Sequence, residues 1–218
     1  MQLKEKDKFM AESLLALEKI YNDIEKLKSF NLDDGSRVGL IIIDMVNGFV
    51  KEGLMASPRI KSIIEPILEI KAICDEKGAS VVALCDCHLE DSVEFLSYPK
   101  HCVKGTNESE IIDELKGVYA INKNSTNGFL EDEFIKWLGH DKDTFIVVGD
   151  CTDICVKQFA ITLKTWFNMN NRMSKVVVPI NAVETYDSDC HNAELINVMS
   201  IYDMMQSGID VVKNIVRG

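Results

Sequence analysis

The stretch VGLIIID at residues 38–44 decides the fold class of this chain. Residues 38–43 form a short, almost wholly apolar run that is β-branched at its end. Such a run, without polar alternation, is typical of a strand buried on both faces of a parallel sheet. The strand ends at Asp44, and a buried carboxylate without a partner is costly. Asp44 is therefore paired, hydrated, functional or the cap of a following element.

Similar apolar runs recur along the chain, and helical patterns separate most of them. We expect strands at residues 38–43, 80–85, 118–121, 144–148, 175–178 and 210–212. We expect helices at residues 59–77, 108–116, 131–138, 153–167 and 189–207. Alternating strands and helices predict an α/β fold, a three-layer α/β/α arrangement around a six-stranded, mostly parallel, doubly wound sheet.

The N-terminal part of the chain has a different pattern. Apolar residues from Met10 to Leu27 recur at steps of three and four, which predicts an extra amphipathic helix within residues 1–30. Residues 31–37, with Asp33, Asp34 and Gly35, predict a loop or linker. We therefore divide the chain into a helix and linker at residues 1–35 and one α/β domain at residues 36–218. The helix packs on that domain or on a second subunit, and we expect a homo-oligomer.

Composition excludes several classes of function. The chain has 218 residues, 46% of them apolar, and a net charge of −11. An acidic surface without a basic stripe disfavours nucleic acids and anionic membranes. No apolar run approaches the ~20 residues that span a bilayer. The charged N-terminus and seven cysteines without a disulfide-like spacing indicate a cytoplasmic protein with reduced thiols.

Three reactive side chains follow different strands. Asp44 follows the first, Lys123 follows the third, and Cys155 lies in the segment GDCTDICV (149–156) after the fourth. Parallel strands bring these residues to one sheet edge, where a carboxylate, an ammonium and a thiol form an activated nucleophile. Cys155 falls in the first turn of a helix, which we expect to lower its pKa and to supply N–H groups for an oxyanion. In the alternative interpretation, the cysteines are simply packed and Lys123 is solvated.

A second cluster follows the second predicted strand. Asp86 and His88 point the same way if this segment is extended, and Glu94 and His101 follow within the next 13 residues. Carboxylate and imidazole groups together suit Zn²⁺, Fe²⁺ or Mn²⁺. The alternative is a surface loop with scattered polar groups.

These residues and motifs resemble the isochorismatase-like cysteine hydrolases, and within them the nicotinamidases, over roughly residues 36–215. Asp44, Lys123 and Cys155 match the family's catalytic aspartate, lysine and cysteine. Asp-Cys-His at 86–88 is similar to the family's Asp-Trp-His, and HCVKGT at 101–106 is similar to its second histidine element. The resemblance also implies a cis peptide bond between Asp150 and Cys151, although Asp150 stands where an apolar residue is usual.

The resemblance implies a function and the residues that carry it. It implies a divalent metal, zinc first and iron or manganese as alternatives, held by Asp86, His88, His101 and a fourth, variable ligand, either Glu94 or Ser92. Phe49 and Tyr98 would hold the substrate ring, and the backbone N–H groups of Cys151 and Cys155 would bind the oxyanion. The implied reaction, part of NAD salvage, converts nicotinamide to nicotinate and ammonia through a thioester.

Other functions stay open at this point. The first is another amidase of the same family that acts on a ureido, carbamoyl or aliphatic amide. The second is a binding protein that keeps the fold without chemistry. A phosphatase that uses Asp44 as its nucleophile usually needs a second acid two residues later, where this chain has Val46.

Overall fold

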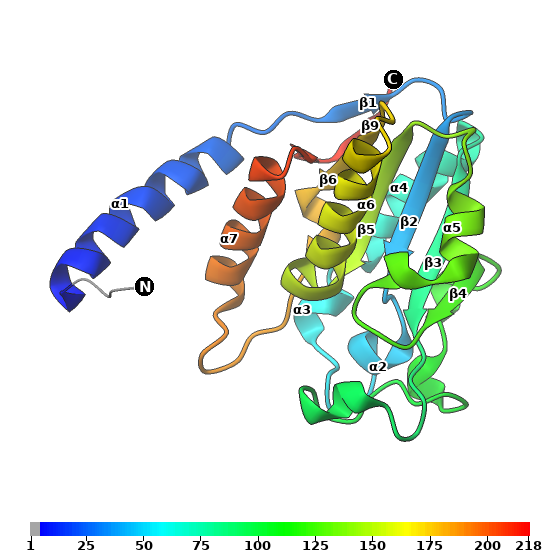
Figure 1. Ribbon diagram of the computed structural model, residues 1–218, viewed down its shortest axis with the longest axis horizontal. Coiled ribbons are helices and arrows are strands. Elements are labelled where there is room, and N and C mark those ends of the chain that lie inside the picture. The colour runs from blue at the N-terminus through cyan, green and yellow to red at the C-terminus, as the bar shows by residue number, and fades with distance from the viewer. Residues whose placement is uncertain (1–4) are drawn as a thin grey trace.

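A computed structural model describes residues 5–218 and places β2 (Val38–Ile43) inside a parallel sheet of seven strands (Figure 1). The strand order is β4-β3-β2-β5-β6-β8, and β7 pairs with β5. The other strands of this sheet are β3 (Ser80–Asp86), β4 (Tyr119–Lys123), β5 (Thr144–Asp150), β6 (Lys175–Pro179), β7 (Val183–Glu184) and β8 (Asp210–Val212). The predicted α/β class and parallel sheet are confirmed, but the sheet has seven strands instead of the expected six, because the two-residue strand β7 also pairs with β5.

Alternate residues of β2 face two different helical layers. Leu40 and Ile42 belong to a core cluster with α4, whereas Ile41 and Ile43 pack in a second cluster with α5, α6 and α7. Both faces of β2 are therefore covered, which explains its continuous apolar sequence. The helices that flank this sheet are α2 (Asn47–Val50), α3 (Pro58–Lys61), α4 (Ile64–Glu76), α5 (Asp132–Leu138), α6 (Lys157–Met169) and α7 (Ala193–Gln206).

The helix predicted at residues 59–77 is two helices, α3 and α4. Pro66 lies in the first turn of α4. A proline ring clashes with the carbonyl four residues earlier, here that of Ser62, and cannot donate a backbone hydrogen bond. The helical pattern is therefore broken at the junction between α3 and α4.

The helix predicted at residues 108–116 is wrong. The segment forms two short 3₁₀ turns, Asn107–Ser109 and Asp113–Leu115, with an extended stretch between them. The Ile112 N–H donates to the Met45 carbonyl, and the Asn47 N–H donates to the Glu110 carbonyl. These bonds to the segment that follows β2 outweigh the local helical preference of the sequence.

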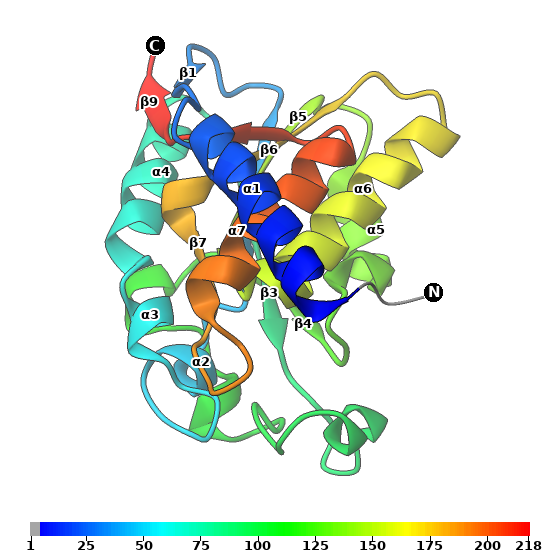
Figure 2. The ribbon, with the colours of Figure 1, turned by 90° about the vertical axis from the view of Figure 1, so that its left-hand side faces the viewer.

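The N-terminal helix α1 (Lys6–Ile24) lies beside α7 (Figure 2) and projects from the body of the domain (Figure 1). Residues 1–4 of the predicted helix and linker lie outside the described residues. The chain then forms a strand that the sequence did not predict: β1 (Phe30–Leu32) pairs in parallel with β9 (Ile215–Arg217). None of the residues of α1 is buried, and the expected homo-oligomer stays a prediction. Within residues 5–218, no helix combines the length and apolarity that a membrane span needs.

Candidate active site

The candidate site lies where the order of the sheet changes direction. The chain passes from β2 outward through β3 and β4, and then returns to the other side of β2 as β5. Open α/β sheets bind ligands at such a switch point, beyond the carboxyl ends of the strands. Asp44 follows β2, while Asp86, Lys123 and Asp150 are the last residues of β3, β4 and β5. Parallel pairing thus brings four ionisable residues, three aspartates and one lysine, to one edge.

The backbone at this edge has an uncommon conformation at two positions. Asp44 has a φ of +56°, and its Oδ1 accepts a hydrogen bond of 2.8 Å from the Asp86 N–H. Gly149 has a φ of +117°, and a Cβ atom there would lie 2.0 Å from the Ile43 carbonyl oxygen. Only glycine allows this close approach of β5 to β2. This close approach places the start of the turn that carries Cys155 next to Asp44.

Lys123 connects the predicted catalytic residues. Its Nζ lies 2.9 Å from Asp44 Oδ2 and 3.8 Å from Cys155 Sγ, forms an ion pair with Asp86, and donates to the Ser125 carbonyl at 3.1 Å. Lys123, Asp44 and Asp86 are each at most 1% exposed. The sequence-predicted aspartate, lysine and cysteine are therefore in contact inside the protein, away from bulk water.

The two buried carboxylates have opposite pKa shifts. Burial and the nearby Asp86 charge raise the pKa of Asp44 to about 7, although Lys123 and a hydrogen bond with Cys155 oppose the shift. Burial also acts on Asp86, but the Lys123 ammonium and the adjacent His101 and His88 imidazoles outweigh it and hold the pKa of Asp86 well below its usual range. The environment of Asp86 therefore favours its ionised form, whereas the raised pKa of Asp44 allows it to exchange a proton near neutral pH.

The Cys155 thiol differs from the sequence-based expectation. Burial raises the pKa of Cys155 well above its ordinary value, with the Asp44 and Asp86 charges acting in the same direction and Lys123 opposing them. Cys155 is only 6% exposed, so the loss of hydration exceeds what a helix end can supply. The expected lowering of this pKa is corrected: the resting group is a neutral thiol, which needs a base in contact with it.

Cys155 lies in a π-helical turn, Thr152–Val156, that leads into α6. The peptide bond between Asp150 and Cys151 is cis, as the family resemblance implies. The N–H groups of Ile154 and Val156 both donate to the Cys151 carbonyl, which winds the turn around that oxygen. These two bonds do not use the N–H groups of Cys151 and Cys155, the two expected oxyanion donors.

Asp86, His88, Glu94 and His101 converge as a set of possible metal ligands. Each offers one ligand atom, and these atoms all lie within 4.8 Å of one another. His88 Nε2 lies 3.3 Å from Asp86 Oδ2 and 3.6 Å from Glu94 Oε1, and it is buried without a hydrogen-bond partner. His101 Nε2 lies 3.4 Å from Asp86 Oδ2. Two imidazoles and two carboxylates around an unsatisfied nitrogen fit a divalent transition metal.

Ser92 has a different place from these four residues. Its side-chain oxygen accepts a hydrogen bond from the Glu94 N–H and caps the 3₁₀ turn Val93–Leu96 that carries Glu94. Of the two candidates for the variable ligand, Glu94 is the one within the cluster.

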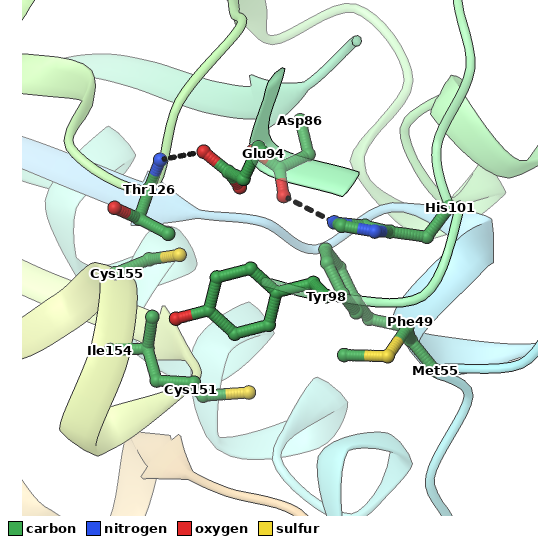
Figure 3. A pocket seen from close by; sticks show the side chains of 10 residues that line it. All are labelled: Phe49, Met55, Asp86, Glu94, Tyr98, His101, Thr126, Cys151, Ile154 and Cys155. Atoms are coloured by element: carbon green, nitrogen blue, oxygen red, sulfur yellow. Dashed lines mark hydrogen bonds and ion pairs between the residues drawn. The ribbon is translucent and has the colours of Figure 1, made fainter. Parts of the chain in front are cut away.

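One cavity connects the thiol with this cluster (Figure 3). Phe49 and Tyr98, the expected substrate-binding residues, line it together with Asp86, His101 and Cys155. The full set of lining residues is Phe49, Met55, Asp86, Glu94, Tyr98, His101, Thr126, Cys151, Ile154 and Cys155. Apolar walls with a few convergent polar groups are typical of a small-molecule site.

Sequence reasoning missed several residues around this cavity. Met55 and Ile154 form part of its apolar wall. The Thr126 N–H donates to Glu94 Oε2 at 3.1 Å, and the Phe95 ring packs against both imidazoles, 5.4 Å from His88 and 5.8 Å from His101 between centroids. Phe95 directly follows the predicted ligand Glu94. The loop has no periodic pattern, so the sequence does not predict which way the Phe95 side chain points.

Comparison with known proteins agrees with this geometry. Residues 38–212 match the isochorismatase domain family. Nicotinamidase 1 of Arabidopsis thaliana is 33% identical over 185 residues, which are 75% of this chain and 73% of that protein. The structure of a Pyrococcus horikoshii pyrazinamidase in complex with zinc superimposes with a TM-score of 0.68 at 24% identity, over 81% of this chain and 99% of that one. An N-carbamoylsarcosine amidase from Thermoplasma acidophilum gives a TM-score of 0.64 at 26% identity, over 81% and 96%.

The chain therefore belongs to the isochorismatase family, and its fold is that of the isochorismatase-like hydrolases. Within this family it is a nicotinamidase-like amidohydrolase, an enzyme that cleaves a carbon–nitrogen bond of an amide.

Proposed function

We propose that this enzyme is a metal-assisted cysteine amidohydrolase that converts nicotinamide to nicotinate and ammonia through a thioester on Cys155. The observation that carries the proposal is that the Cys155 thiol and the carboxylate–imidazole cluster open on the same cavity. The apolar walls of this cavity, which include the Phe49 and Tyr98 rings, suit a single aromatic ring with one carboxamide. The similarity to the Arabidopsis nicotinamidase supports this substrate.

The substrate ring would lie between the aromatic side chains of Phe49 and Tyr98. Asp86, His88, Glu94 and His101 would hold the metal, which when bound supplies a Lewis acid that orients the pyridine nitrogen. Zinc is our first assignment, because the related Pyrococcus pyrazinamidase was solved in complex with zinc. Iron and manganese accept the same kinds of ligand.

In the first half of the reaction, the ionised Asp44 takes the proton of the Cys155 thiol. The sulfur attacks the carboxamide carbon, and the N–H groups of Cys151 and Cys155 stabilise the negative oxygen that forms. The carbon–nitrogen bond then breaks, and Asp44 returns the proton to the departing ammonia. Lys123 keeps negative charge favourable at this site throughout, because its ammonium contacts Asp44 and lies 3.8 Å from the sulfur.

In the second half, a water molecule replaces ammonia and gives a proton to Asp44. The resulting hydroxide attacks the thioester carbon, the carbon–sulfur bond breaks, and Cys155 recovers its proton from Asp44. The products are nicotinic acid, which ionises to nicotinate, and a regenerated thiol, so one water is consumed for each ammonia released. We place this reaction in NAD salvage, in the cytoplasm, where the seven free cysteines would remain reduced.

Measuring ammonia release from nicotinamide, with metal analysis of the same sample, tests the proposal. We expect turnover of nicotinamide by protein that holds a divalent metal. Metal-containing protein that releases no ammonia from nicotinamide would contradict the substrate assignment.

A second substrate class is tested in the same assay. The structural similarity to N-carbamoylsarcosine amidase favours carbamoyl amides as the alternative. Turnover of N-carbamoylsarcosine in preference to nicotinamide would assign the enzyme to that class. We expect the opposite preference, because the carboxylate–imidazole cluster faces the cavity.

A further inference from the structure

Asn124 contacts the outer side of the proposed metal centre. It follows Lys123, the last residue of β4, and its Oδ1 accepts a 3.0 Å hydrogen bond from the Leu89 N–H. The same Oδ1 lies 3.4 Å from Nδ1 of His88. Asn124 therefore contacts a proposed metal ligand and the residue directly after that ligand.

These contacts determine the orientation of the Asn124 side-chain amide, and this orientation determines which nitrogen of the His88 ring carries a hydrogen. A backbone N–H donates only to an acceptor, so the Asn124 atom that faces Leu89 is the oxygen and not the nitrogen. An imidazole nitrogen that faces this oxygen must carry a hydrogen to bond with it. His88 therefore bears its hydrogen on Nδ1.

The opposite nitrogen of His88 is then available to a metal. With hydrogen on Nδ1, the Nε2 lone pair points toward Asp86 and Glu94, at 3.3 and 3.6 Å from their oxygens. His101 has the same arrangement, because its Nδ1 lies 2.6 Å from the Pro99 carbonyl oxygen. The His101 ring is therefore oriented by a backbone carbonyl, and the His88 ring is oriented by the Asn124 side chain. Only the second of these contacts can be removed by a side-chain substitution.

The backbone of His88 does not depend on Asn124. The His88 N–H donates to the Cys102 carbonyl at 2.9 Å, and the His88 carbonyl accepts from the Lys104 N–H at 2.8 Å. His88 and Val103 form a parallel bridge through these bonds. Loss of the Asn124 amide should therefore release the ring of His88 while the chain around it stays folded.

We propose that Asn124 is a positioning residue of the metal centre, which fixes the His88 ring so that Nε2 is presented to the metal. This inference rests on the metal site of the proposed function. An oxygen that bonds the distal nitrogen of a metal-bound histidine typically contributes about 10–100-fold to metal affinity.

Zinc binding by four proteins tests the inference. The dissociation constant for zinc alone is measured by competition with a chromophoric chelator in wild type, Asn124→Ala, Asn124→Asp and Asn127→Ala. We expect Asn124→Ala to bind zinc about 10–100-fold more weakly. Asn124→Asp should recover most of the affinity, because its carboxylate also accepts from both partners. Asn127→Ala is the matched control: Asn127 is in the same loop but bonds with Phe129 and Thr162.

A spectroscopic measurement on zinc-free protein separates positioning from general stability. Ring ¹⁵N chemical shifts at alkaline pH should report hydrogen on Nδ1 of His88 in wild type and a shift toward Nε2 in Asn124→Ala. Wild-type zinc affinity in Asn124→Ala, or an unchanged ring signal, would overturn this inference alone. A wild-type protein that binds no divalent metal would overturn the proposed metal site together with it.

Discussion

The ammonium of Lys123 lies 2.9 Å from Asp44 Oδ2 in the interior of the protein, where the two side chains are 1% and 0% exposed. The same ammonium pairs with Asp86, so one cation serves two buried carboxylates. Removal of one partner from such a buried cluster leaves charge without compensation. Stability and chemistry at this sheet edge therefore depend on the same side chain.

Replacement of Lys123 by methionine should destabilise the protein by about 3–5 kcal/mol, because two buried carboxylates lose their cation. Urea unfolding monitored by circular dichroism measures this change. Lys142→Met is the matched control: Lys142 is also buried, but its carboxylate partner Asp141 is 70% exposed. We expect that control to cost about 1 kcal/mol, from the hydrogen bond to Trp137. Equal losses in both variants would contradict the role of charge compensation.

Replacement of Cys155 by alanine should lower kcat by at least about 10⁴-fold, because the nucleophile is lost. Nicotinamide should still bind, since the aromatic walls and the metal ligands remain, and calorimetric titration measures this binding. Cys190→Ala should keep wild-type activity, because Cys190 is exposed and away from the cavity lining. Substantial turnover by Cys155→Ala would exclude a thioester mechanism.

The value of kcat/KM should fall as the pH falls through about 7. Burial and the Asp86 charge raise the pKa of Asp44 to about 7. Below that pH, Asp44 holds a proton and cannot accept one from Cys155; above it, the base is ionised. A pH–rate profile measures this, with bound metal quantified at each pH so that metal loss is separated from protonation. A flat profile across neutral pH would argue against Asp44 as the base.

Removal of the metal by a chelator should abolish most activity, and added zinc should restore it. His101→Ala should reduce both bound metal and turnover, because it removes one of the four converging ligands. His140→Ala is the matched control, since His140 is exposed and does not belong to the cluster. Metal analysis and ammonia release on the same samples provide both readouts. Full activity in protein stripped of metal would show that the cluster has another role.

Replacement of Gly149 by alanine should destabilise the protein by at least about 2 kcal/mol more than the same change at Gly78. Both glycines have a positive φ, so both variants pay the conformational cost of the left-handed region. Only at Gly149 does the new Cβ meet an atom, the Ile43 carbonyl oxygen at 2.0 Å. Thermal unfolding compares the two variants, and equal shifts would mean that β5 can move away from β2.

The residue pattern alone predicts the parallel sheet and the edge at which the site forms. Continuous apolar runs such as residues 38–43 identify strands buried on both faces, and parallel strands must end at one edge. The same pattern therefore predicts that Asp44, Lys123 and Cys155 lie together. The motif around Asp86, His88 and His101 indicated a metal site in the same way, through spacing and resemblance.

Features that depend on contacts between residues distant in sequence are visible only in the folded structure. The extended stretch between the 3₁₀ turns Asn107–Ser109 and Asp113–Leu115 forms because Met45 and Asn47 bond with it, against its helical pattern. The raised pKa of Cys155 follows from burial, which a helix-terminus argument from sequence cannot measure. The contact of Asn124 with His88, 36 positions apart, exists because β3 and β4 pair side by side and their loops meet. The local sequence pattern thus determines which residues reach the carboxyl edge of the sheet. Packing of the folded chain determines the pKa shifts of these residues and the side chains that they contact.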